Sequence, residues 1–300
     1  MERPFPVVDF QKLCEQEELN KLREACEKCG CFRIINHHVP VTLMTDMKSV
    51  AKSLHELPPE IKRRNTSVIP DSGYVPPIKT SPLYEGLGIY DMHVTPQALY
   101  DFCSHLNVSS HQRQILEAYG EAIHGLASGI SQKMAESLGV VGADFEDWPF
   151  IFRIIKYNFS PENIGSLGVQ PHSDTGFITL LQDDEKVGGL ETMDDSGSYV
   201  AVPPLSGSFL CIIGDVGHAW SNGRFYNVKH RVICKETTTR FSFGAFMLAS
   251  RDSNVDAPKD LVDPGHPRLF HPFKYEDLRM FRISTGKRTG EVLDQFRITA

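Results

Sequence analysis

Hydrophobic residues recur every three or four positions over three stretches of the first half of the chain, and this spacing predicts amphipathic helices. The clearest stretch runs from Ile115 to Leu138. An earlier one, from Leu19 to Cys29, ends at Gly30, a residue type that commonly terminates helices. A third helix is expected between Pro40 and Pro58. Short strands are expected at Phe5–Phe10 and Cys31–Ile35, and a C-terminal helix at Tyr275–Phe281.

After Trp148 the hydrophobic period changes from helical to strand-like, in short runs separated by Gly, Pro or Asp. Asn222-Gly223 is a typical hairpin turn, because a type I′ turn needs a positive φ at both central residues. Many short, closely spaced strands predict an α+β, mainly β fold of the barrel or jelly-roll kind. The expected strands are Phe152–Phe159, Phe177–Leu181, Tyr199–Val202, Phe209–Ile213, Phe225–Val228, Arg231–Cys234 and Phe241–Leu248.

These patterns divide the chain into three regions. Residues 1–148 form a mixed, mainly helical N-terminal region, residues 149–250 a β core, and residues 251–300 a C-terminal loop and helix. Within the first region, residues 65–93 are rich in proline and glycine and carry no clear period, so we expect a loop there. A loop of that length is more often functional than not, and we interpret it as a lid over a substrate.

Composition and charge exclude several classes of protein. Thirty-one Lys and Arg against 38 Asp and Glu give a net charge of −7, which argues against a nucleic-acid partner. No run of apolar residues is long enough to cross a membrane, and the opening MERPFPVVDF lacks the features of a signal peptide. Seven cysteines, an odd number, indicate reduced thiols, so we expect a cytoplasmic protein.

A candidate metal site begins with the H-x-D sequence His172-Ser173-Asp174, whose outer residues would share one face of a strand. With 12 histidines and 38 acidic residues, such a pair arises about once or twice by chance, so it carries little weight alone. His230 lies in a second β-rich segment. Two histidines and one carboxylate on neighbouring strands can bind one face of an octahedral metal, as in non-haem Fe(II) oxygenases.

A candidate anion site follows ten residues after His230. Arg240, Ser242, Gly244 and Phe246 alternate along one predicted strand and therefore share a face. A guanidinium group with a neighbouring hydroxyl suits a carboxylate, which arginine binds through two hydrogen bonds. The same R-x-[ST] spacing occurs elsewhere in the chain, and only the position after His230 selects this copy.

Four blocks together resemble the plant-type iron(II)/2-oxoglutarate-dependent dioxygenases: CFRIINHHVP, QPHSDTGFITLLQDDEKVGGLE, SNGRFYNVKHRV and RFSFGAF. The resemblance implies a double-stranded β-helix (jelly roll) with flanking N-terminal and C-terminal helices. It implies that His172, Asp174 and His230 bind Fe(II), and that Arg240, Ser242 and Tyr157 hold the distal carboxylate of 2-oxoglutarate. Dioxygen would be the oxidant, with ascorbate in a supporting role. His38 and Ile212 depart from the family pattern, which usually has Gly and Asn there.

Other segments, SGYVPP, YEGLGIYD and HPRLF among them, resemble the auxin-oxidising branch of that family. This branch implies that indole-3-acetic acid is oxidised to 2-oxindole-3-acetic acid, which inactivates the hormone. A different small-molecule substrate, a gibberellin or a flavonoid, would use the same chemistry. A non-catalytic jelly-roll sensor of a small acid is the alternative from another class. Neither the residue that binds the substrate carboxylate nor the oligomeric state follows from the sequence.

Some residues allow a structural and a functional interpretation. Phe246, Tyr74, Phe177 and Tyr90 are candidates for the substrate pocket, although aromatic residues in β runs are more often core. Cys26, Cys29 and Cys31 suggest zinc, but a fourth ligand at suitable spacing is missing and buried thiols are favoured. Gly86-Leu87-Gly88 lacks the third glycine and the setting of a dinucleotide-binding loop.

Overall fold

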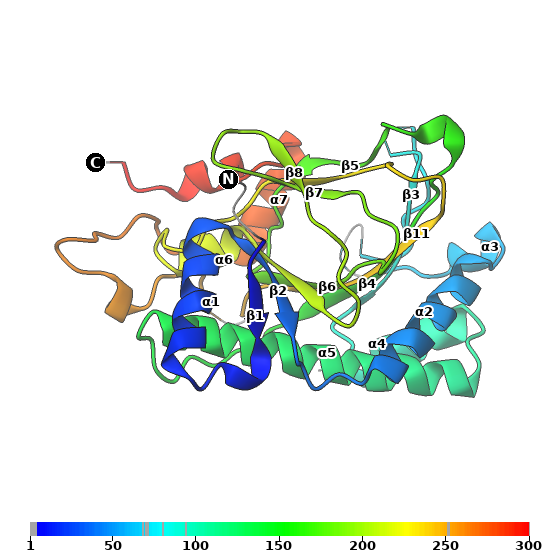
Figure 1. The fold of residues 1–300 in the computed structure, drawn as a ribbon, viewed down its shortest axis with the longest axis horizontal. Coiled ribbons are helices and arrows are strands. Elements are labelled where there is room, and N and C mark those ends of the chain that lie inside the picture. Colours follow the sequence, from blue (N-terminus) through cyan, green and yellow to red (C-terminus); the bar gives the residue numbers. More distant parts are fainter. Residues whose placement is uncertain are drawn as a thin grey trace.

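Two β-sheets face each other in the computed structural model, which describes residues 5–67, 69, 72–79, 81–93, 95–250 and 253–299 (Figure 1). The larger sheet has seven strands in the order β1-β2-β9-β6-β11-β4-β3, and the smaller has four in the order β5-β10-β7-β8. All neighbours are antiparallel except the β1–β2 pair. The strands are β1 (Val7–Asp9), β2 (Cys31–Ile35), β3 (Tyr84–Tyr90), β4 (Phe150–Tyr157), β5 (Leu167–His172), β6 (Ile178–Gln182), β7 (Leu190–Met193), β8 (Tyr199–Ala201), β9 (Phe209–Ile213), β10 (His230–Ile233) and β11 (Arg240–Met247).

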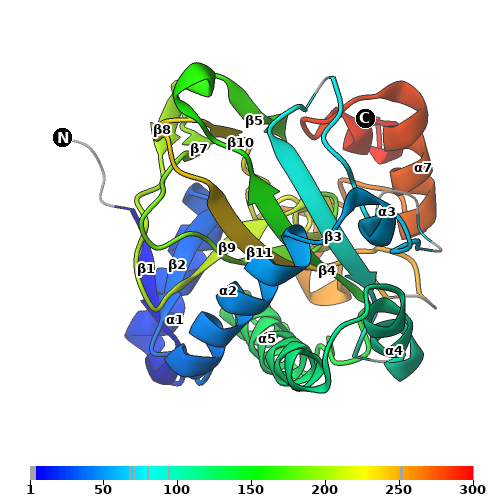
Figure 2. The same ribbon diagram turned by 90° about the vertical axis from the view of Figure 1, so that its right-hand side faces the viewer.

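Helices cover the outer side of the seven-stranded sheet (Figures 1 and 2). The longest, α5, contacts β6 and β11 of that sheet, and α1 and α2 pack beside it. None of the helices in the described part of the chain has the length and apolarity needed to span a bilayer. The helices are α1 (Gln16–Lys28), α2 (Val41–His55), α3 (Pro59–Lys62), α4 (Pro96–His105), α5 (Ser110–Ser137), α6 (Asp215–Trp220) and α7 (Tyr275–Thr285), with 3-10 turns at Phe10–Lys12, Pro161–Asn163, Lys259–Leu261 and Glu291–Phe296.

The two faces of the seven-stranded sheet have different roles, because side chains alternate along each strand. The outer face carries residues such as Phe152, Ile154 and Phe243, which form the main hydrophobic core with the helices. The inner face carries residues such as Ile155 and Leu181, which form a second, smaller core against the four-stranded sheet. The space between the sheets is therefore only partly filled by apolar side chains.

Much of the predicted architecture is present. The long helix is confirmed as α5, and it begins with a capping box in which Ser109 and Gln112 satisfy each other's backbone amides. Gly30, with φ +65, follows α1, and a Cβ at this position would lie 2.1 Å from the carbonyl oxygen of Tyr226. The β-rich second half is also confirmed. Strands from residues 1–148 join the same sheet as those from residues 149–250, since β1, β2 and β3 complete the seven-stranded sheet.

The prediction of an uninterrupted loop over residues 65–93 is wrong, because Tyr84–Tyr90 is the edge strand β3. Residues 68, 70, 71 and 80 of that segment lie outside the described residues. Two features of YEGLGIY obscure the strand pattern. Glu85 occupies a buried outward position beside Leu87 and Ile89, and Gly86 occupies an inward one. A buried charge and a missing side chain both weaken the alternation on which strand prediction relies.

The strand predicted at Phe225–Val228 is also absent, and Asn222-Gly223 does not close a hairpin. Both residues do have positive φ, 52° and 79°, as their types predicted. They instead follow α6, where the amide of Gly223 donates to the carbonyl of His218. The Asn-Gly dipeptide thus predicted the backbone conformation correctly. It did not predict which secondary-structure elements lie on either side.

A buried ion pair fastens the N-terminal strands to the β core. Arg33 on β2 donates to both carboxylate oxygens of Asp183, at 2.6 and 2.9 Å, and to the carbonyl of Pro203 at 2.7 Å. The side chains of Arg33 and Asp183 are only 2% and 5% exposed. Such a pair is costly to break, because removing one member leaves the other charge buried and uncompensated.

Replacing Arg33 with Met is therefore expected to lower the free energy of unfolding by about 3–5 kcal/mol. Urea denaturation followed by circular dichroism measures the change. Arg23→Met is the matched control, because Arg23 forms an exposed pair with Glu27 whose loss is expected to cost under about 1 kcal/mol. If the two variants unfold at the same midpoint urea concentration, the Arg33–Asp183 pair has no structural role of the kind described.

Candidate metal centre and active site

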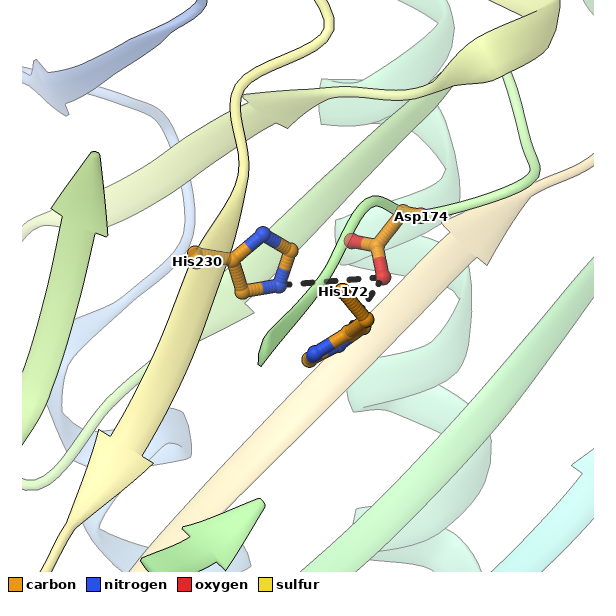
Figure 3. A group of neighbouring side chains, drawn as sticks. All are labelled: His172, Asp174 and His230. Atoms are coloured by element: carbon orange, nitrogen blue, oxygen red, sulfur yellow. Dashed lines mark ion pairs between the residues drawn. The ribbon is translucent and has the colours of Figure 1, made fainter. Parts of the chain in front are cut away.

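Two imidazoles and a carboxylate converge between the sheets (Figure 3). His172, the last residue of β5, lies directly opposite His230, the first residue of β10, in the antiparallel register. Oδ1 of Asp174 lies 3.6 Å from Nε2 of His172 and 3.8 Å from Nε2 of His230. Within the described ranges, these three residues are the group whose potential ligand atoms all lie within 4.8 Å of one another.

The expectation that His172 and Asp174 share one face of a strand is wrong. β5 ends at His172, and Asp174 lies in the turn that leads to β6. The turn is fixed on both sides, since the amide of Ser173 donates to the carbonyl of Arg288 and the amide of Asp215 donates to that of Asp174. It brings the carboxylate toward both imidazoles from the side, which alternation along a straight strand would not achieve.

Hydrogen bonds orient each group of the cluster. Nδ1 of His172 donates to the carbonyl of Gln170 at 2.8 Å, and Nδ1 of His230 donates to that of Val228 at 3.3 Å. With Nδ1 protonated in this way, the Nε2 lone pair of each ring faces the shared centre. The hydroxyl of Thr179 donates to Oδ2 of Asp174 at 2.5 Å, which leaves Oδ1 directed at the histidines.

Electrostatics favours a neutral His172 imidazole and an ionised Asp174 carboxylate. Burial, together with the neighbouring His230, lowers the pKa of His172. Burial by itself would raise the pKa of Asp174, but His230, His172 and the Thr179 hydrogen bond oppose it and leave that pKa below its ordinary value. Two neutral nitrogen donors and one anionic oxygen donor fit a divalent transition metal that keeps open coordination positions.

A candidate anion-binding part of the cavity is formed by Arg240 and Tyr157. Arg240 on β11 is paired in register with Tyr157 on β4, and Tyr157 with Tyr84 on β3. Cζ of Arg240 lies 5.1 Å from the centre of the Tyr157 ring. Burial raises the pKa of Tyr157 to about 12, although the nearby Arg240 charge opposes the shift, so its hydroxyl stays protonated.

Three buried polar atoms at this end have no hydrogen-bond partner: Nε and Nη1 of Arg240 and Oγ of Ser242. Buried donors are nearly always paired in folded proteins. These guanidinium N–H groups and the Ser242 hydroxyl lie next to the Tyr157 hydroxyl, and together they fit the carboxylate of a bound molecule. Ser242 lies two positions from Arg240 on the same face of β11.

A cavity of about 350 Å³ connects the metal cluster to the arginine. Its wall is mainly apolar, and it also contains the guanidinium-bearing residues Arg153 and Arg288. This combination of an apolar surface with a few charged groups is typical of small-molecule sites. The lining residues are Val75, Pro76, Ile78, Ser81, Tyr84, Arg153, Ile155, Tyr157, Val169, His172, Asp174, Thr179, Leu181, Leu190, Ile212, His230, Val232, Arg240, Phe246 and Arg288.

Of the four aromatic residues predicted to bind substrate, only Phe246 lines this cavity. Phe177 faces the other way and is fully buried among Phe145, Trp148 and Trp220. The hydroxyl of Tyr74 donates to Glu85 on the outer side of β3. Tyr90 lies at the far end of β3 and borders two other cavities. Parity along β6 does not extend to Phe177, although Thr179 and Leu181 face inward, because Phe177 lies in the turn before the strand begins at Ile178.

Several site residues were not predicted from the sequence. Thr179, which fixes the carboxylate of Asp174, lies five residues further along the chain, and only the turn at 173–177 brings them together. The sequence could have indicated Arg153, because it lies four positions before Tyr157 on the same predicted strand and therefore shares its face. Asp215 accepts from Ser173 and Asn227 at 2.9 and 2.8 Å, and burial raises its pKa to about 6. No local sequence signal indicated that buried contact.

The cysteine cluster has the geometry of core thiols. Cys26 and Cys31 are buried, Cys29 is partly buried, and none of the three forms a disulfide. Burial raises the pKa of the Cys26 and Cys31 thiols well above the ordinary value, which disfavours the thiolate that a metal needs. No described cysteine belongs to the metal-type group found above.

Comparisons with known proteins agree with this geometry. The 2OG-Fe(II) oxygenase superfamily matches residues 149–249, and a family described as the N-terminal region of non-haem dioxygenases in morphine synthesis matches residues 5–110. The 2-oxoglutarate-dependent dioxygenase DAO of rice (Oryza sativa subsp. japonica) is 49% identical over 278 residues, which is 92% of each chain.

Two solved structures extend the comparison. The crystal structure of the rice dioxygenase for auxin oxidation has a TM-score of 0.91 and 46% identity, and covers 98% of this chain and 100% of that one. Dioxygenase for auxin oxidation 1 from Arabidopsis thaliana, in a complex with 2-oxoglutarate, has a TM-score of 0.84 and 47% identity. That match covers 88% of this chain and 100% of the other.

Removal of the carboxylate is expected to abolish metal binding. Asp174→Ala leaves two neutral imidazoles, and its affinity for Fe(II) or Mn(II) should fall by more than about 100-fold. Thr179→Val keeps the carboxylate but not its hydrogen bond, so we expect a smaller loss of about 10-fold. Anaerobic titration followed by Mn(II) electron paramagnetic resonance measures both.

Asp195→Ala is the control, because Asp195 is exposed in a turn far along the chain from the cluster. Tight Mn(II) binding by Asp174→Ala, equal to that of Asp195→Ala, would remove Asp174 from the metal site.

Proposed function

The chain belongs to the 2OG-Fe(II) oxygenase superfamily, and on that basis we propose that it oxidises indole-3-acetic acid to 2-oxindole-3-acetic acid. It is an iron(II)- and 2-oxoglutarate-dependent dioxygenase. The observation that carries the proposal is one cavity that joins a His-Asp-His cluster to a buried arginine with unpaired donors. Its apolar wall and further arginines suit a small aromatic acid.

His172, Asp174 and His230 are the residues that would hold the iron. In these enzymes the bound metal supplies dioxygen activation, in which 2-oxoglutarate is converted to succinate and carbon dioxide while one oxygen atom enters the organic substrate. The protein contributes position and charge. The neutral Nε2 atoms and Oδ1 of Asp174 meet on one side of the centre, so the other side stays open toward the cavity.

Arg240 and Ser242 would hold the distal carboxylate of 2-oxoglutarate. Nε and Nη1 of Arg240 and Oγ of Ser242 are the donors without partners. Arg240 lines the cavity, whereas Ser242, two positions further along the same face of β11, is not part of the lining. The Tyr157 hydroxyl stays protonated at neutral pH and can add a third donor. These groups are fixed on adjacent strands, β11 and β4, before any ligand binds, so little ordering is needed on binding.

The acid group of the substrate needs a cation of its own, because Arg240 is committed to the co-substrate. Arg153 and Arg288 are the further guanidinium-bearing residues of the cavity wall. Arg153 is fixed on β4, two positions along the inner face from Ile155, and we propose it as the partner of the substrate carboxylate. Ile155, Leu181, Ile212 and Phe246 provide the apolar surface for an indole ring.

The comparisons support this substrate, because the rice and Arabidopsis proteins that align along most of the chain carry names that refer to auxin oxidation. We further propose the cytoplasm as its compartment. None of the seven cysteines forms a disulfide, and five of them are buried, which suits a reducing environment.

Arg240→Ala is expected to raise the KM for 2-oxoglutarate by about 100-fold, the size expected when a buried charge-assisted contact is lost. The KM for the organic acid should change far less, because that acid binds elsewhere in the cavity. Steady-state kinetics with each substrate varied in turn separates the two values. Arg113→Ala, on α5 and outside the cavity, is the control, and an unchanged 2-oxoglutarate KM would remove Arg240 from this role.

The substrate assignment is tested with purified protein, Fe(II), 2-oxoglutarate, ascorbate and indole-3-acetic acid in air. Mass spectrometry follows succinate and a gain of one oxygen on the indole, with a gibberellin and a flavonoid in parallel. We expect succinate and oxidised indole in equal amounts. Coupled oxidation of the gibberellin or flavonoid alone would replace the auxin assignment, and no product from iron-loaded protein would favour a sensor.

A further inference from the structure

A buried cluster of charged and polar side chains lies outside the active site, on the helix side of β3. Nζ of Lys62 donates to Oε1 of Glu85 at 2.6 Å and to the carbonyl of His55 at 3.0 Å. Nδ1 of His55 lies 3.4 Å from Oε2 of Glu85. The hydroxyl of Tyr74 donates to Oε1 of Glu85 at 2.8 Å. Lys62, Glu85 and His55 are each at most 5% exposed.

The residues next to Glu85 face the opposite way, toward the cavity. Side chains alternate along β3, so Tyr84 lines the cavity while Glu85 points to α2 and α3. β3 is the last strand of the seven-stranded sheet, and its outer edge is open to further pairing. One strand thus carries a cavity wall on one face and a buried carboxylate on the other.

The segment of residues 72–78 occupies that open edge. Val75 pairs with Gly86 through two backbone hydrogen bonds, of 2.8 and 2.9 Å. A Cβ on Gly88 would lie 2.0 Å from the carbonyl oxygen of Ser72, so the close approach requires glycine there. Val75, Pro76 and Ile78 form part of the cavity wall. Tyr74, which directly precedes Val75, does not line the cavity.

Tyr74 connects this wall segment to the buried cluster. Its side chain leaves the edge of the sheet on the opposite side from the cavity and ends on Oε1 of Glu85. The acceptor is ionised: burial would raise the pKa of Glu85, but its contacts with His55, Lys62 and Tyr74 lower it to about 2. A hydrogen bond to a charged group is stronger than one between neutral groups.

We propose that Tyr74 and Glu85 form a latch that positions the wall segment 72–78 over the organic substrate. Tyr74 is then a positioning residue that controls how tightly the aromatic acid is held and how well its oxidation is coupled to 2-oxoglutarate turnover. The latch acts through Val75, Pro76 and Ile78 and has no contact with the metal cluster. The inference rests on the proposed function for its substrate, but its structural part can be tested without one.

Tyr74→Phe removes the hydroxyl and keeps the ring, and Glu85 retains Lys62 and His55, so the fold is expected to survive. The KM for indole-3-acetic acid should rise by about 5–10-fold, corresponding to roughly 1–1.4 kcal/mol, part of the lost hydrogen bond. The KM for 2-oxoglutarate should stay unchanged. Succinate should exceed oxidised indole, because a displaced wall leaves the substrate less well placed. Tyr100→Phe, the same change at an exposed site on α4, is the control.

Hydrogen exchange provides the readout that needs no substrate. The amides of Val75 and Gly86 bond to each other's carbonyls, and in Tyr74→Phe they should exchange about tenfold faster than in Tyr100→Phe. If wild-type protein oxidises no indole acid but these amides still lose protection, the proposed function fails and the latch stands. Unchanged exchange, or unchanged KM and coupling in an active enzyme, would overturn the latch.

Discussion

The direct pairing of His172 with His230 across β5 and β10 is the constraint on which the site depends. It places the two imidazoles with ring centres 4.1 Å apart between the sheets, where burial and the neighbouring ring disfavour protonation of His172 by lowering its pKa. Two imidazole donors and a neighbouring buried carboxylate form a stable set when a cation shares them. The turn that delivers Asp174, the Thr179 hydroxyl and the backbone carbonyls of Gln170 and Val228 all serve to keep that set oriented.

The division of the seven-stranded sheet into two faces explains how such polar groups are tolerated. Its outer face, packed on α5, carries the larger hydrophobic core and accounts for most of the apolar burial. The inner face is therefore free to carry Arg240, Ser242 and Tyr157, whose desolvation would otherwise weaken a small core. The buried donors on this face that lack a partner cost folding free energy, and a ligand that accepts their hydrogen bonds recovers that energy on binding.

The edge strand β3 links the two halves of the molecule. The N-terminal region supplies β3 and the segment that lies along its edge, and both contribute residues to a cavity whose metal ligands belong to the second half. Edge strands need protection against unwanted pairing, and here the protecting segment is also part of the substrate wall. In the proposed function, substrate recognition is thereby separated from metal binding, which would involve residues on β5 and β10 and in the turn after β5.

The long helix α5, the β-rich second half and the positive φ of Asn222 and Gly223 followed from the sequence, because periodicity and local sterics determine them. The same holds for the common face of Arg240, Ser242 and Phe246, since alternation is a local property of a strand. For His172, Asp174 and His230, four sequence blocks gave the candidates through resemblance, and the structure brings them within reach of one another.

Tertiary structure alone decided the rest. Phe177 lies in an aromatic core and Tyr74 lies behind β3, although both were expected at the substrate, because the turn before β6 and the path of the chain along the edge of β3 decide which way they face. The sequence did not predict β3, because the charged Glu85 interrupts its hydrophobic pattern. Glu85 can be buried because it pairs with Lys62 of α3, a helix that precedes β3 in the chain. Thr179 acquired its place through the turn at 173–177, and Asp215 through hydrogen bonds with Ser173 and Asn227. Sequence patterns describe what each segment prefers locally, whereas these contacts depend on which segments meet.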